Sequence, residues 1–551
     1  MTLSTLNDLI QTSAREFAGK PAVSFAFEKP MVYRDFQKTV RRVAAFLSRR
    51  KVTKGDTVAI LAENSPNWGI AYFAIVRLGA IAVPILPDFT GPDVRQIIAD
   101  SGATILFTTE QQIEKIYEMK KHPLRLVITL DNFTDDNELL NCMTFRQCIQ
   151  DGKDAVLPDR AVTSEDPASI IYTSGTSGHS KAVVLTHSNF MACTNSASRL
   201  IAIRKDWTFL SMLPMSHTYE FSIGFLLPLM TGARIVYTGK PPTPTILHKI
   251  CQKEKPDVIC VVPVIMEKIY KKRVAATINN NKLLNYCVMI PGVRNIILKA
   301  IGRKLLDFFG GRLQLAAIGG APMIKEIEIF FYKSGFPYLV GYGLTETAPL
   351  LSGGPFRDPT IAVGSSGKPI PGVEIRINDP DPRTGTGEIL ARGPNIMQGY
   401  YKNPELTAQT IDADGWLSTG DLGYLDDRNN LFITGRSKSV IVLAHGENIY
   451  PETIEDKINA NYHVAESLVI DNNGRLEAII YLDYDLISLE TGDQSQAAQL
   501  EYIGGLLDKI QKETNAQLPL YSRISKCIER REPFVKTATH KIKRYLYSKE
   551  S

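Results

Sequence analysis

Paired cysteines are missing from this sequence. Its 551 residues include 7 cysteines, scattered along the chain, with no C-x-x-C pair and no paired Cys/His spacing. Such a set argues against a disulfide framework and against a structural zinc site. The N-terminus also lacks a basic stretch followed by an apolar one, which is the pattern of an export signal. We therefore expect a cytoplasmic location.

Long hydrophobic runs and a strong charge of one sign are missing as well. The most apolar windows, such as 221–230, are far shorter than the roughly 20 residues that cross a bilayer, so we expect no membrane span. The formal net charge of +5 is small for this length and does not indicate a nucleic-acid partner. The length predicts about three or four folding units, which argues against a minimal binding module.

Helix-like and strand-like segments alternate in the N-terminal part of the chain. Apolar residues recur at helical spacing between charged ones, and continuous apolar runs rich in β-branched residues separate these helices. The pattern predicts helices at 35–50, 67–78 and 92–100 and strands at 57–61, 80–86 and 103–109. Buried strands that alternate with helices are typical of a parallel sheet with crossover helices. We therefore predict an α/β fold.

The pattern of apolar, Gly and Pro residues changes twice towards the C-terminus. From about 360 to 435, short strand-like runs with frequent Gly and Pro predict a small antiparallel barrel or sheet. After Arg436, a helix-like run and a hairpin turned at Asn473-Gly474 predict a compact α+β unit. The sequence therefore predicts a large N-terminal domain, 1–435, and a small C-terminal domain, 436–551.

The most unusual segment is IIYTSGTSGHSKAVVLTH, residues 170–187. Between two strand-like runs it holds glycines, hydroxyl side chains and one lysine, a combination that suits a cradle for phosphate oxygens. The candidate phosphate-binding residues are Thr173, Ser174, Gly175, Thr176, Ser177, Gly178 and Lys181. A flexible Ser/Gly linker is the alternative, but linkers are seldom flanked by two β-rich runs. The segment departs twice from the Walker A pattern, at Ser180 and Ala182, which argues against a P-loop kinase or ATPase.

This loop resembles the phosphate loop of the adenylate-forming enzymes, which include acyl- and aryl-CoA synthetases, peptide-synthetase adenylation domains and firefly luciferase. Six further segments correspond to motifs of that family, in the family's order. They are LPMSHTYE (213–220), IGGAP (318–322), VGYGLTETAP (340–349), GWLSTGDLGYLDD (415–427), GRSKSVIVLAHGENIYPETIE (435–455) and KTATHKIKR (536–544). The forms HTYE and VPVIMEKIY (262–270), with His540 where many members carry Gly, most resemble the long-chain fatty acyl-CoA synthetase branch.

The resemblance implies a nucleotide site. The loop from Thr173 to Lys181 would hold the β- and γ-phosphates of ATP, Thr345 would bond the α-phosphate, and Glu346 with Thr173 would bind Mg²⁺. Tyr342, between Gly341 and Gly343, would lie on the adenine, with Gly320 and Ala321 on its other side. Asp421 would bond the ribose hydroxyls, and Arg436 would reach the ribose and a phosphate.

The resemblance also implies a two-step reaction, in which a fatty acid carboxylate attacks MgATP and coenzyme A then displaces AMP. Lys541 would meet the carboxylate and the α-phosphate, and His217 would flank the reacting carboxylate. Lys438 would be the hinge about which a mobile C-terminal domain turns, and Gly446 would border the CoA channel. The apolar segment FSIGFLLPLM, 221–230, next to His217 is a candidate lining for a tunnel that takes medium- to long-chain acids.

Taken singly, several of these residues have ordinary structural interpretations. Glu346 suits a helix start, Tyr342 a core position, Asp421 a turn, His217 a structural histidine, and the neighbours of Lys541 a solvated C-terminal helix. Three other functions also stay open: transfer of the acyl group to a carrier protein, a luciferase-like oxidation, and nucleotide binding without catalysis. The ordered motifs favour a ligase, and the sequence leaves the oligomeric state undetermined.

A peripheral membrane contact is a further hypothesis. Residues 293–309 place an apolar stripe beside basic residues, which suits interfacial binding to anionic lipid. The stripe consists of Val293, Ile297, Ile301, Leu305 and Phe308. A helix packed on its domain with a solvated basic face is the alternative, and the pattern favours that alternative.

Overall fold

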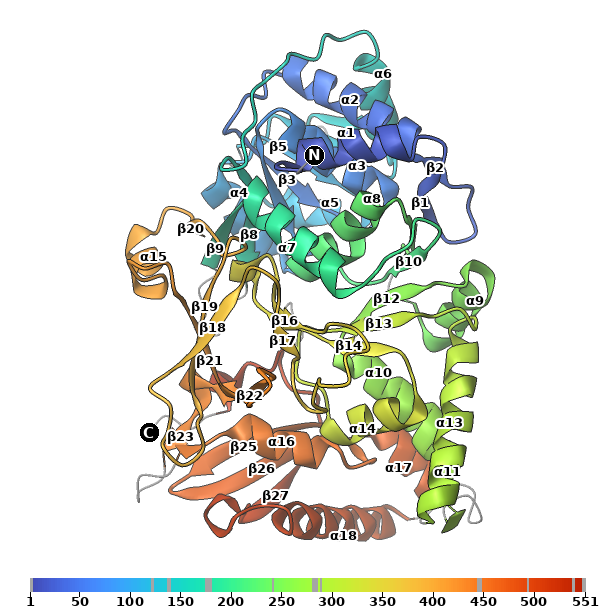
Figure 1. Ribbon diagram of the computed structural model, residues 1–551, viewed down its shortest axis with the longest axis vertical. Helices are drawn as coiled ribbons and strands as arrows, with labels where there is room; N and C mark the ends of the chain where they lie inside the picture. Colours follow the sequence, from blue (N-terminus) through green and yellow to red (C-terminus); the bar gives the residue numbers. More distant parts are fainter. Residues whose placement is uncertain are drawn as a thin grey trace.

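The computed structural model (Figure 1) describes most of the chain. The described residues are 3–119, 123–135, 140–173, 181–239, 242–279, 286–287, 290–442, 448–492, 495–537 and 541–547. They form two large parallel sheets with helices, several small antiparallel sheets, and an α+β unit that follows them. The predicted α/β fold class is confirmed.

The first large sheet has eight strands in the order β20-β9-β8-β4-β3-β5-β6-β7. Its strands are β3 (Thr57–Leu61), β4 (Ile81–Ile85), β5 (Ile105–Thr108), β6 (Leu126–Thr129), β7 (Cys142–Thr144), β8 (Pro167–Thr173), β9 (Lys181–Thr186) and β20 (Gly399–Tyr400). The pairs from β8 to β7 are parallel, whereas β9 runs antiparallel to both β8 and β20. Helix α2 (Tyr33–Arg49) leads from β2 into β3, and the crossover helices between successive parallel strands are α3 (Pro66–Arg77), α4 (Gly91–Ser101) and α5 (Glu110–Tyr117). The six helices and strands expected here all form, within a few residues of their predicted ends.

The second large sheet has seven strands in the order β14-β13-β12-β10-β11-β1-β2, parallel except for the pair β1-β2. Its strands are β1 (Pro21–Phe25), β2 (Met31–Val32), β10 (Thr208–Ser211), β11 (Arg234–Tyr237), β12 (Val258–Val261), β13 (Leu315–Ile318) and β14 (Tyr338–Val340). Its helices include α9 (Pro244–Glu254), α10 (Pro263–Ile269), α13 (Pro291–Phe308), α14 (Lys325–Ser334) and the π-helices η1 (Glu220–Leu226) and η2 (Tyr270–Ala275).

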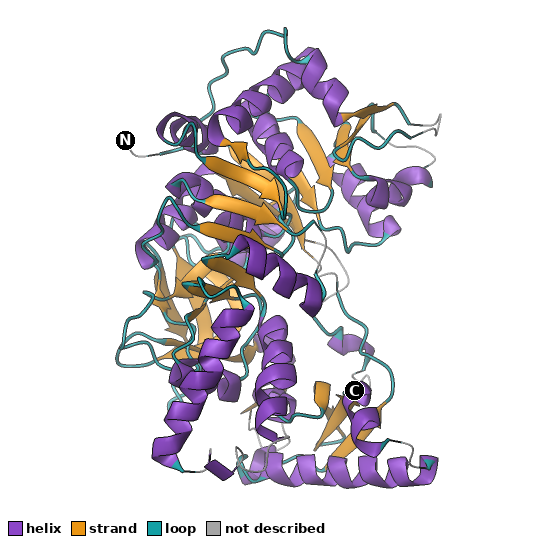
Figure 2. Cartoon of the chain, turned by 90° about the vertical axis from the view of Figure 1, so that its right-hand side faces the viewer, coloured by secondary structure: helices purple, strands orange, loops and turns teal. Residues whose placement is uncertain are grey.

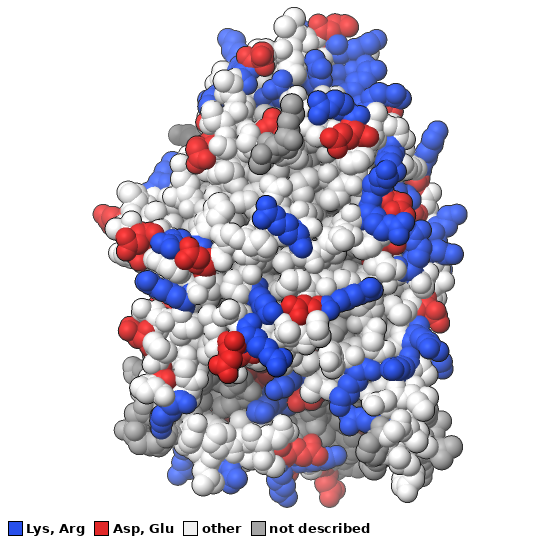
Figure 3. Space-filling view, viewed as in Figure 1, with Lys and Arg blue, Asp and Glu red and all other residues white. Residues whose placement is uncertain are grey.

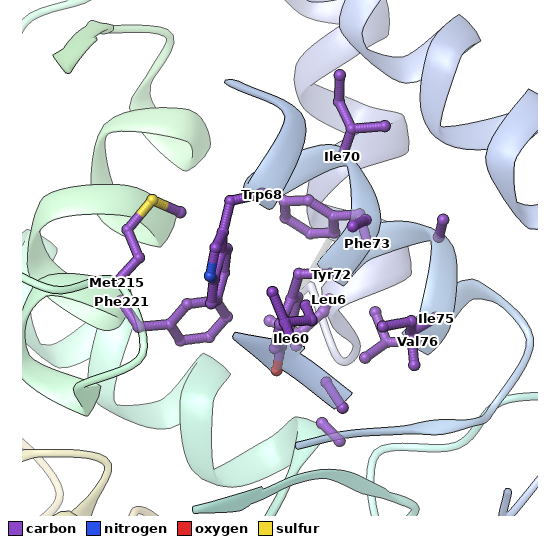
Figure 4. Packing of buried hydrophobic residues seen from close by; sticks show 14 of the residues in the cluster. Leu6, Ile60, Trp68, Ile70, Tyr72, Phe73, Ile75, Val76, Met215 and Phe221 are labelled. Carbon is purple, nitrogen blue, oxygen red and sulfur yellow. The ribbon is translucent and has the colours of Figure 1, made fainter. Parts of the chain in front are cut away.

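The core between the two sheets is built on α3. Every residue from Trp68 to Val76 is buried, as expected of a helix that is apolar on all sides and covered on all sides. The Trp68 and Tyr72 rings stack with centroids 5.6 Å apart, and Phe221 of η1 lies 4.4 Å from Tyr72 (Figure 4). Phe221 and Phe225 are thus part of this core. The interpretation of 221–230 as a tunnel wall is therefore largely wrong, although Ile223 does line the cavity described below.

Smaller sheets follow the second large sheet. Strands β18 (Glu374–Asn378), β19 (Gly387–Arg392), β21 (Leu417–Leu425) and β22 (Leu431–Arg436) form an antiparallel sheet, as expected for this region. A three-stranded sheet contains β15 (Tyr342–Gly343), β16 (Leu350–Gly353) and β17 (Lys368–Pro369). Asp421 of β21 lies directly opposite Arg436 of β22. The register of this antiparallel sheet therefore pairs two residues of the expected nucleotide site.

In the C-terminal unit, as we call residues 448–547, the described residues form a three-stranded sheet and three α-helices. They are β25 (Val464–Asn472), β26 (Arg475–Leu482), β27 (Lys526–Arg530), α16 (Pro451–Asn459), α17 (Tyr484–Thr491) and α18 (Gln496–Asn515), with α18 along the lower edge in Figure 2. Asn473 and Gly474 turn the β25-β26 hairpin with φ of 54° and 79°, as their sequence predicts. The solvated C-terminal helix expected around Lys541 is wrong: Lys526 and Arg530 lie on β27.

The apolar stripe of 293–309 does not form one free face. Leu305 and Phe308 are buried in the core beside the second sheet, and only the start of α13 exposes apolar side chains such as Val293 and Ile296. This favours the packed helix over a membrane-bound one. Within the described ranges, no helix is both long and apolar enough to span a membrane. Both signs of charge occur among uncharged side chains on the face drawn in Figure 3.

Candidate active site

A single cavity of about 2450 Å³ collects the expected site residues. It lies where the carboxyl ends of parallel strands from both large sheets meet the C-terminal unit, the usual place for a ligand in an α/β protein. Among the described candidates, those that line it are Thr173, Lys181, His217, Gly320, Ala321, Gly341, Tyr342, Gly343, Thr345, Glu346, Asp421, Arg436, Lys438 and Lys541. Ser174, Gly175, Thr176, Ser177, Gly178 and Gly446 lie outside the described residues.

Tyr342, Asp421 and Arg436 form one hydrogen-bonded group in this cavity. The Tyr342 hydroxyl donates to Asp421 Oδ2 at 2.8 Å, and Arg436 Nε lies 3.0 Å from Asp421 Oδ1. Asp421 is only 4% exposed, so its charge is compensated by Arg436 rather than by water. Burial and the Asp421 carboxylate raise the pKa of Tyr342, which keeps the hydroxyl protonated as a donor. Asp421 can accept hydrogen bonds from ligand hydroxyl groups, and Arg436 places a positive charge near the Tyr342 ring.

Backbone geometry on the same wall requires glycine. A Cβ at Gly343 would lie 1.7 Å from the Pro349 carbonyl oxygen, and Gly320 has a φ of +88°. Neither position tolerates a side chain without a backbone shift. Gly343 therefore lets its strand pass close to the Pro349 backbone, and Gly320 supplies a left-handed backbone conformation.

Glu346 is held by a tyrosine that the sequence interpretation missed. It lies on the short helix η3 (Thr345–Thr347), and its Oε1 accepts a hydrogen bond of 2.9 Å from the Tyr400 hydroxyl. Lys181 Nζ lies 3.5 Å from the same hydroxyl and 5.0 Å from the ring centroid. Tyr400 reaches this place because β20 pairs with β9 across more than two hundred residues of sequence. Its only sequence signal was a Gly-Tyr-Tyr run, which is too common to indicate a site.

Removal of the Tyr400 hydroxyl should weaken adenylate formation. In Tyr400→Phe the ring that faces Lys181 stays, while Glu346 loses a donor worth about 1.5–3 kcal/mol. We expect about a tenfold slower pyrophosphate exchange, a larger Mg²⁺ requirement and a nearly unchanged Tm. Tyr401→Phe, one position along the chain, is the matched control. An unchanged Mg²⁺ requirement would contradict a role for Tyr400 in holding Glu346.

Lys541 enters the cavity from the end of the chain. Its side chain is accessible because it projects into the wide cavity, and the protein atoms that form the cavity walls surround it. Burial and the positive charge of Arg436 lower the pKa of Lys541 to about 8, against the opposing effects of Asp421 and Glu346. The Lys541 ammonium therefore lies near Glu346, expected at the phosphates of a nucleotide, and near Asp421 and Arg436, expected at its ribose.

His217 faces the same region as a neutral ring. Burial, together with the charge of Lys541, lowers the pKa of His217 to about 4. Its Nδ1 accepts the backbone N–H of Tyr219 at 3.2 Å, so in the neutral ring the proton lies on Nε2. His217 can therefore donate one hydrogen bond from Nε2 to a carboxylate, but it does not carry a charge at neutral pH.

Glu220, the first residue of η1, carries a fully buried carboxyl group. Burial raises its pKa to about 8, and the Ser211 hydroxyl and the Leu213 backbone offset only part of this effect. Because the folded pKa lies above the ordinary 4.5, the folded protein binds this proton more tightly than the unfolded chain. Stability should therefore fall as the pH rises from about 4.5 to about 8 and stay level above that range.

Glu220→Gln should remove this part of the pH dependence. The Tm of the variant minus the Tm of the natural protein should increase by a few degrees between pH 5 and pH 8. Thermal unfolding scans at several pH values would measure this difference. Glu532→Gln, at an exposed position, should show no such trend. A constant difference across the range would mean that Glu220 is ionised in the folded protein.

The described residues offer oxygen ligands for a metal ion that is bound partly by the protein and partly by the phosphates of a nucleotide. They contain no group of three or more His, Cys, Asp or Glu side chains arranged to hold a metal by itself. Glu346 and Thr173 line the cavity and supply hard oxygen donors, the kind that Mg²⁺ takes when phosphates complete its shell. The donor set therefore fits Mg²⁺ brought in with a nucleotide.

Comparison with known proteins identifies the family. The model of the AMP-binding enzyme family matches residues 10–401. The chain belongs to this family. It is 30% identical over 467 residues to a long-chain-fatty-acid–CoA ligase, FadD15, of Mycobacterium bovis, covering 81% of this chain and 76% of that protein. It is 28% identical over 486 residues to 4-coumarate–CoA ligase 2 of Oryza sativa, covering 84% of this chain and 80% of that protein.

Among solved structures, the fold is similar to the O-succinylbenzoate coenzyme A synthetase MenE of Bacillus subtilis in complex with ATP and magnesium. The TM-score is 0.74 at 23% identity, covering 98% of both chains. With these relatives, this member of the AMP-binding family is an AMP-forming acyl-CoA ligase. The named acids of the relatives differ from one another, so family membership leaves the acid open.

Proposed function

We propose that this AMP-binding enzyme activates a medium- to long-chain fatty acid with MgATP and transfers the acyl group to coenzyme A. One observation carries the proposal: Lys541, from the end of the chain, meets Glu346, Asp421 and Arg436 in one cavity. The ligase relative from M. bovis, which is named for a long-chain fatty acid, supports the choice of acid. The HTYE and VPVIMEKIY segments support it as well.

In the first step a carboxylate oxygen of the acid attacks the α-phosphorus of ATP, and the bond to pyrophosphate breaks. Lys541 supplies positive charge where negative charge builds on the phosphoryl oxygens, and His217 Nε2 donates a hydrogen bond that orients the carboxylate. Thr173 and Lys181 bind the leaving phosphates, and Thr345 bonds the α-phosphate. Glu346 and Thr173 would hold Mg²⁺, which would supply positive charge to the phosphates. Tyr342, Gly320 and Ala321 hold the adenine, while Asp421 and Arg436 hold the ribose.

In the second step the thiol of coenzyme A releases its proton to water and its sulfur attacks the acyl carbonyl, so that the bond between the acyl group and AMP breaks and AMP leaves. We propose that the C-terminal domain, 436–551, turns about Lys438 between the two steps relative to residues 1–435. Lys438 suits a hinge because it is exposed on a short 3-10 helix, Ser437–Ser439, just after β22. Gly446 would border the channel that coenzyme A then uses.

A panel of acids tests the substrate. Acetate, octanoate, palmitate, benzoate and 4-coumarate are each supplied with MgATP, and pyrophosphate exchange, AMP and the CoA ester are followed. Each buried CH₂ contributes about 0.8 kcal/mol, so kcat/KM should rise by orders of magnitude from acetate to a long acid. Turnover confined to acetate or to the aromatic acids would contradict the fatty-acid proposal. Exchange without a CoA ester would favour a carrier protein as the acceptor.

We propose that the enzyme is cytoplasmic, where it would have to reach acids that partition into membranes. Leu305 and Phe308 keep α13 packed on the second large sheet, and we propose a peripheral contact through its exposed start alone, where Val293 and Ile296 lie near Arg294 and Lys299. Co-sedimentation with anionic vesicles at low salt tests it, and equal recovery in the supernatant with and without vesicles would remove it.

A further inference from the structure

Lys271 of η2 makes a three-way contact with the C-terminal unit. Its Nζ donates hydrogen bonds to the backbone carbonyls of Asn459 at 2.9 Å, Asn461 at 3.1 Å and Val464 at 2.8 Å. An ammonium has three N–H groups, so these three bonds use its whole donor capacity. The side chain therefore joins the second large sheet's helices to the far end of α16.

The C-terminal end of α16, which Lys271 contacts, is a favourable position for a positive charge. The last carbonyls of a helix have no partner within the helix and carry the negative end of its dipole. Ala460, just beyond α16, also packs against the core of the second sheet. Burial lowers the pKa of Lys271, while Glu267 and Asp483 oppose that effect. Lys271 thus caps α16 from a different part of the chain, in a largely water-excluded contact.

The same helix is tied to the segment that carries Lys541. Arg544, three residues after Lys541, pairs with Glu455 of α16 and lies 3.6 Å from Glu452. Glu455 Oε1 also accepts the backbone N–H of Val469, which fixes the carboxylate on β25. A continuous set of contacts therefore runs from Lys271 through α16 and Arg544 to the strand-like segment of Lys541.

We propose that Lys271 is a positioning residue for the first half-reaction: by capping α16 it holds the C-terminal unit where Lys541 faces the cavity. Release of this cap accompanies the turn that admits coenzyme A. The proposal rests on the function proposed above, in which Lys541 serves adenylation. Figure 1 shows α16 next to α14 of the second large sheet.

Three variants test it: Lys271→Met, which keeps the length without the charge, Lys271→Arg, and Lys253→Met at an exposed position of α9 as the control. Pyrophosphate exchange measures the first half-reaction, and CoA ester formation from supplied acyl-adenylate measures the second. Lys271→Met should slow exchange about tenfold and leave the second half-reaction unchanged or faster. Lys271→Arg should recover most of the loss, and Lys253→Met should match the natural protein. An equal fall in both half-reactions at unchanged Tm, or no fall in exchange, would overturn the proposal.

Lysine labelling of the natural protein gives a test that needs no variant. N-hydroxysuccinimidyl acetate modifies accessible amines, and mass spectrometry of peptides reads each lysine. Lys271 should react at least tenfold more slowly than Lys253 in the ligand-free protein and with acid plus MgATP. Its reactivity should rise when CoA is added. Labelling as fast as that of Lys253 would overturn the proposal even if Lys271→Met does not fold. Absence of exchange by the natural protein with every acid would instead refute the proposed function.

Discussion

Lys541→Ala should slow acyl-adenylate formation about a hundredfold and spare thioester formation from supplied acyl-adenylate. Lys541 lies in the cavity beside Arg436, Asp421 and Glu346, where it can meet charge that develops on the attacked phosphate. Loss of one such donor in a preorganised site costs about 3 kcal/mol. Pyrophosphate exchange and single-turnover transfer to CoA separate the two half-reactions. Lys526→Ala, at an exposed position on β27, is the matched control.

The pH profile provides a second measurement of the same group. Because the pKa of Lys541 is lowered to about 8, the ammonium is present below that pH and is lost above it. The kcat/KM of adenylation should therefore be level near pH 7 and fall as the pH rises through about 8. Equal damage to both half-reactions in Lys541→Ala, or a flat profile up to pH 9.5, would contradict the role given to this lysine.

Lys438→Pro should show the opposite asymmetry. Proline fixes φ near −65°, and a hinge residue has to change its backbone angles during the turn between the half-reactions. Lys438 is exposed, so loss of its side chain should cost little stability. We expect pyrophosphate exchange within about threefold of the natural rate and a CoA ester formation rate lowered by more than tenfold.

Lys438→Ala separates the backbone from the side chain, since alanine keeps φ free. It should behave like the natural protein in both half-reactions. If Lys438→Ala and Lys438→Pro were equally impaired, the ammonium rather than the backbone would matter, and the hinge would have to lie elsewhere. A parallel fall of exchange and transfer in Lys438→Pro would lead to the same conclusion.

Local patterns in the sequence were sufficient for much of the fold. The apolar spacing of 35–50 predicted α2, the β-branched runs predicted β3, β4 and β5, and Asn473-Gly474 predicted the β25-β26 turn. Each of these signals acts within one element, because backbone hydrogen bonding and side-chain direction repeat over a few residues. The basic tail misled for the same reason: its charges have no period, and pairing with β26 decides that Lys526 to Arg530 form a strand.

The sequence by itself determined which residue types are available to the site that we propose, because its motifs supply hydroxyl, carboxylate and basic side chains suited to a nucleotide and a carboxylate. Tertiary structure alone decided which of these side chains touch and what holds them. The Tyr400–Glu346 hydrogen bond, the burial of Phe221 against α3 and the cap of Lys271 on α16 all join segments that are far apart in sequence. Such contacts depend on strand order and on how helices pack on a sheet. No pattern within a single element encodes them, because their energy comes from surfaces that meet only after the chain has folded.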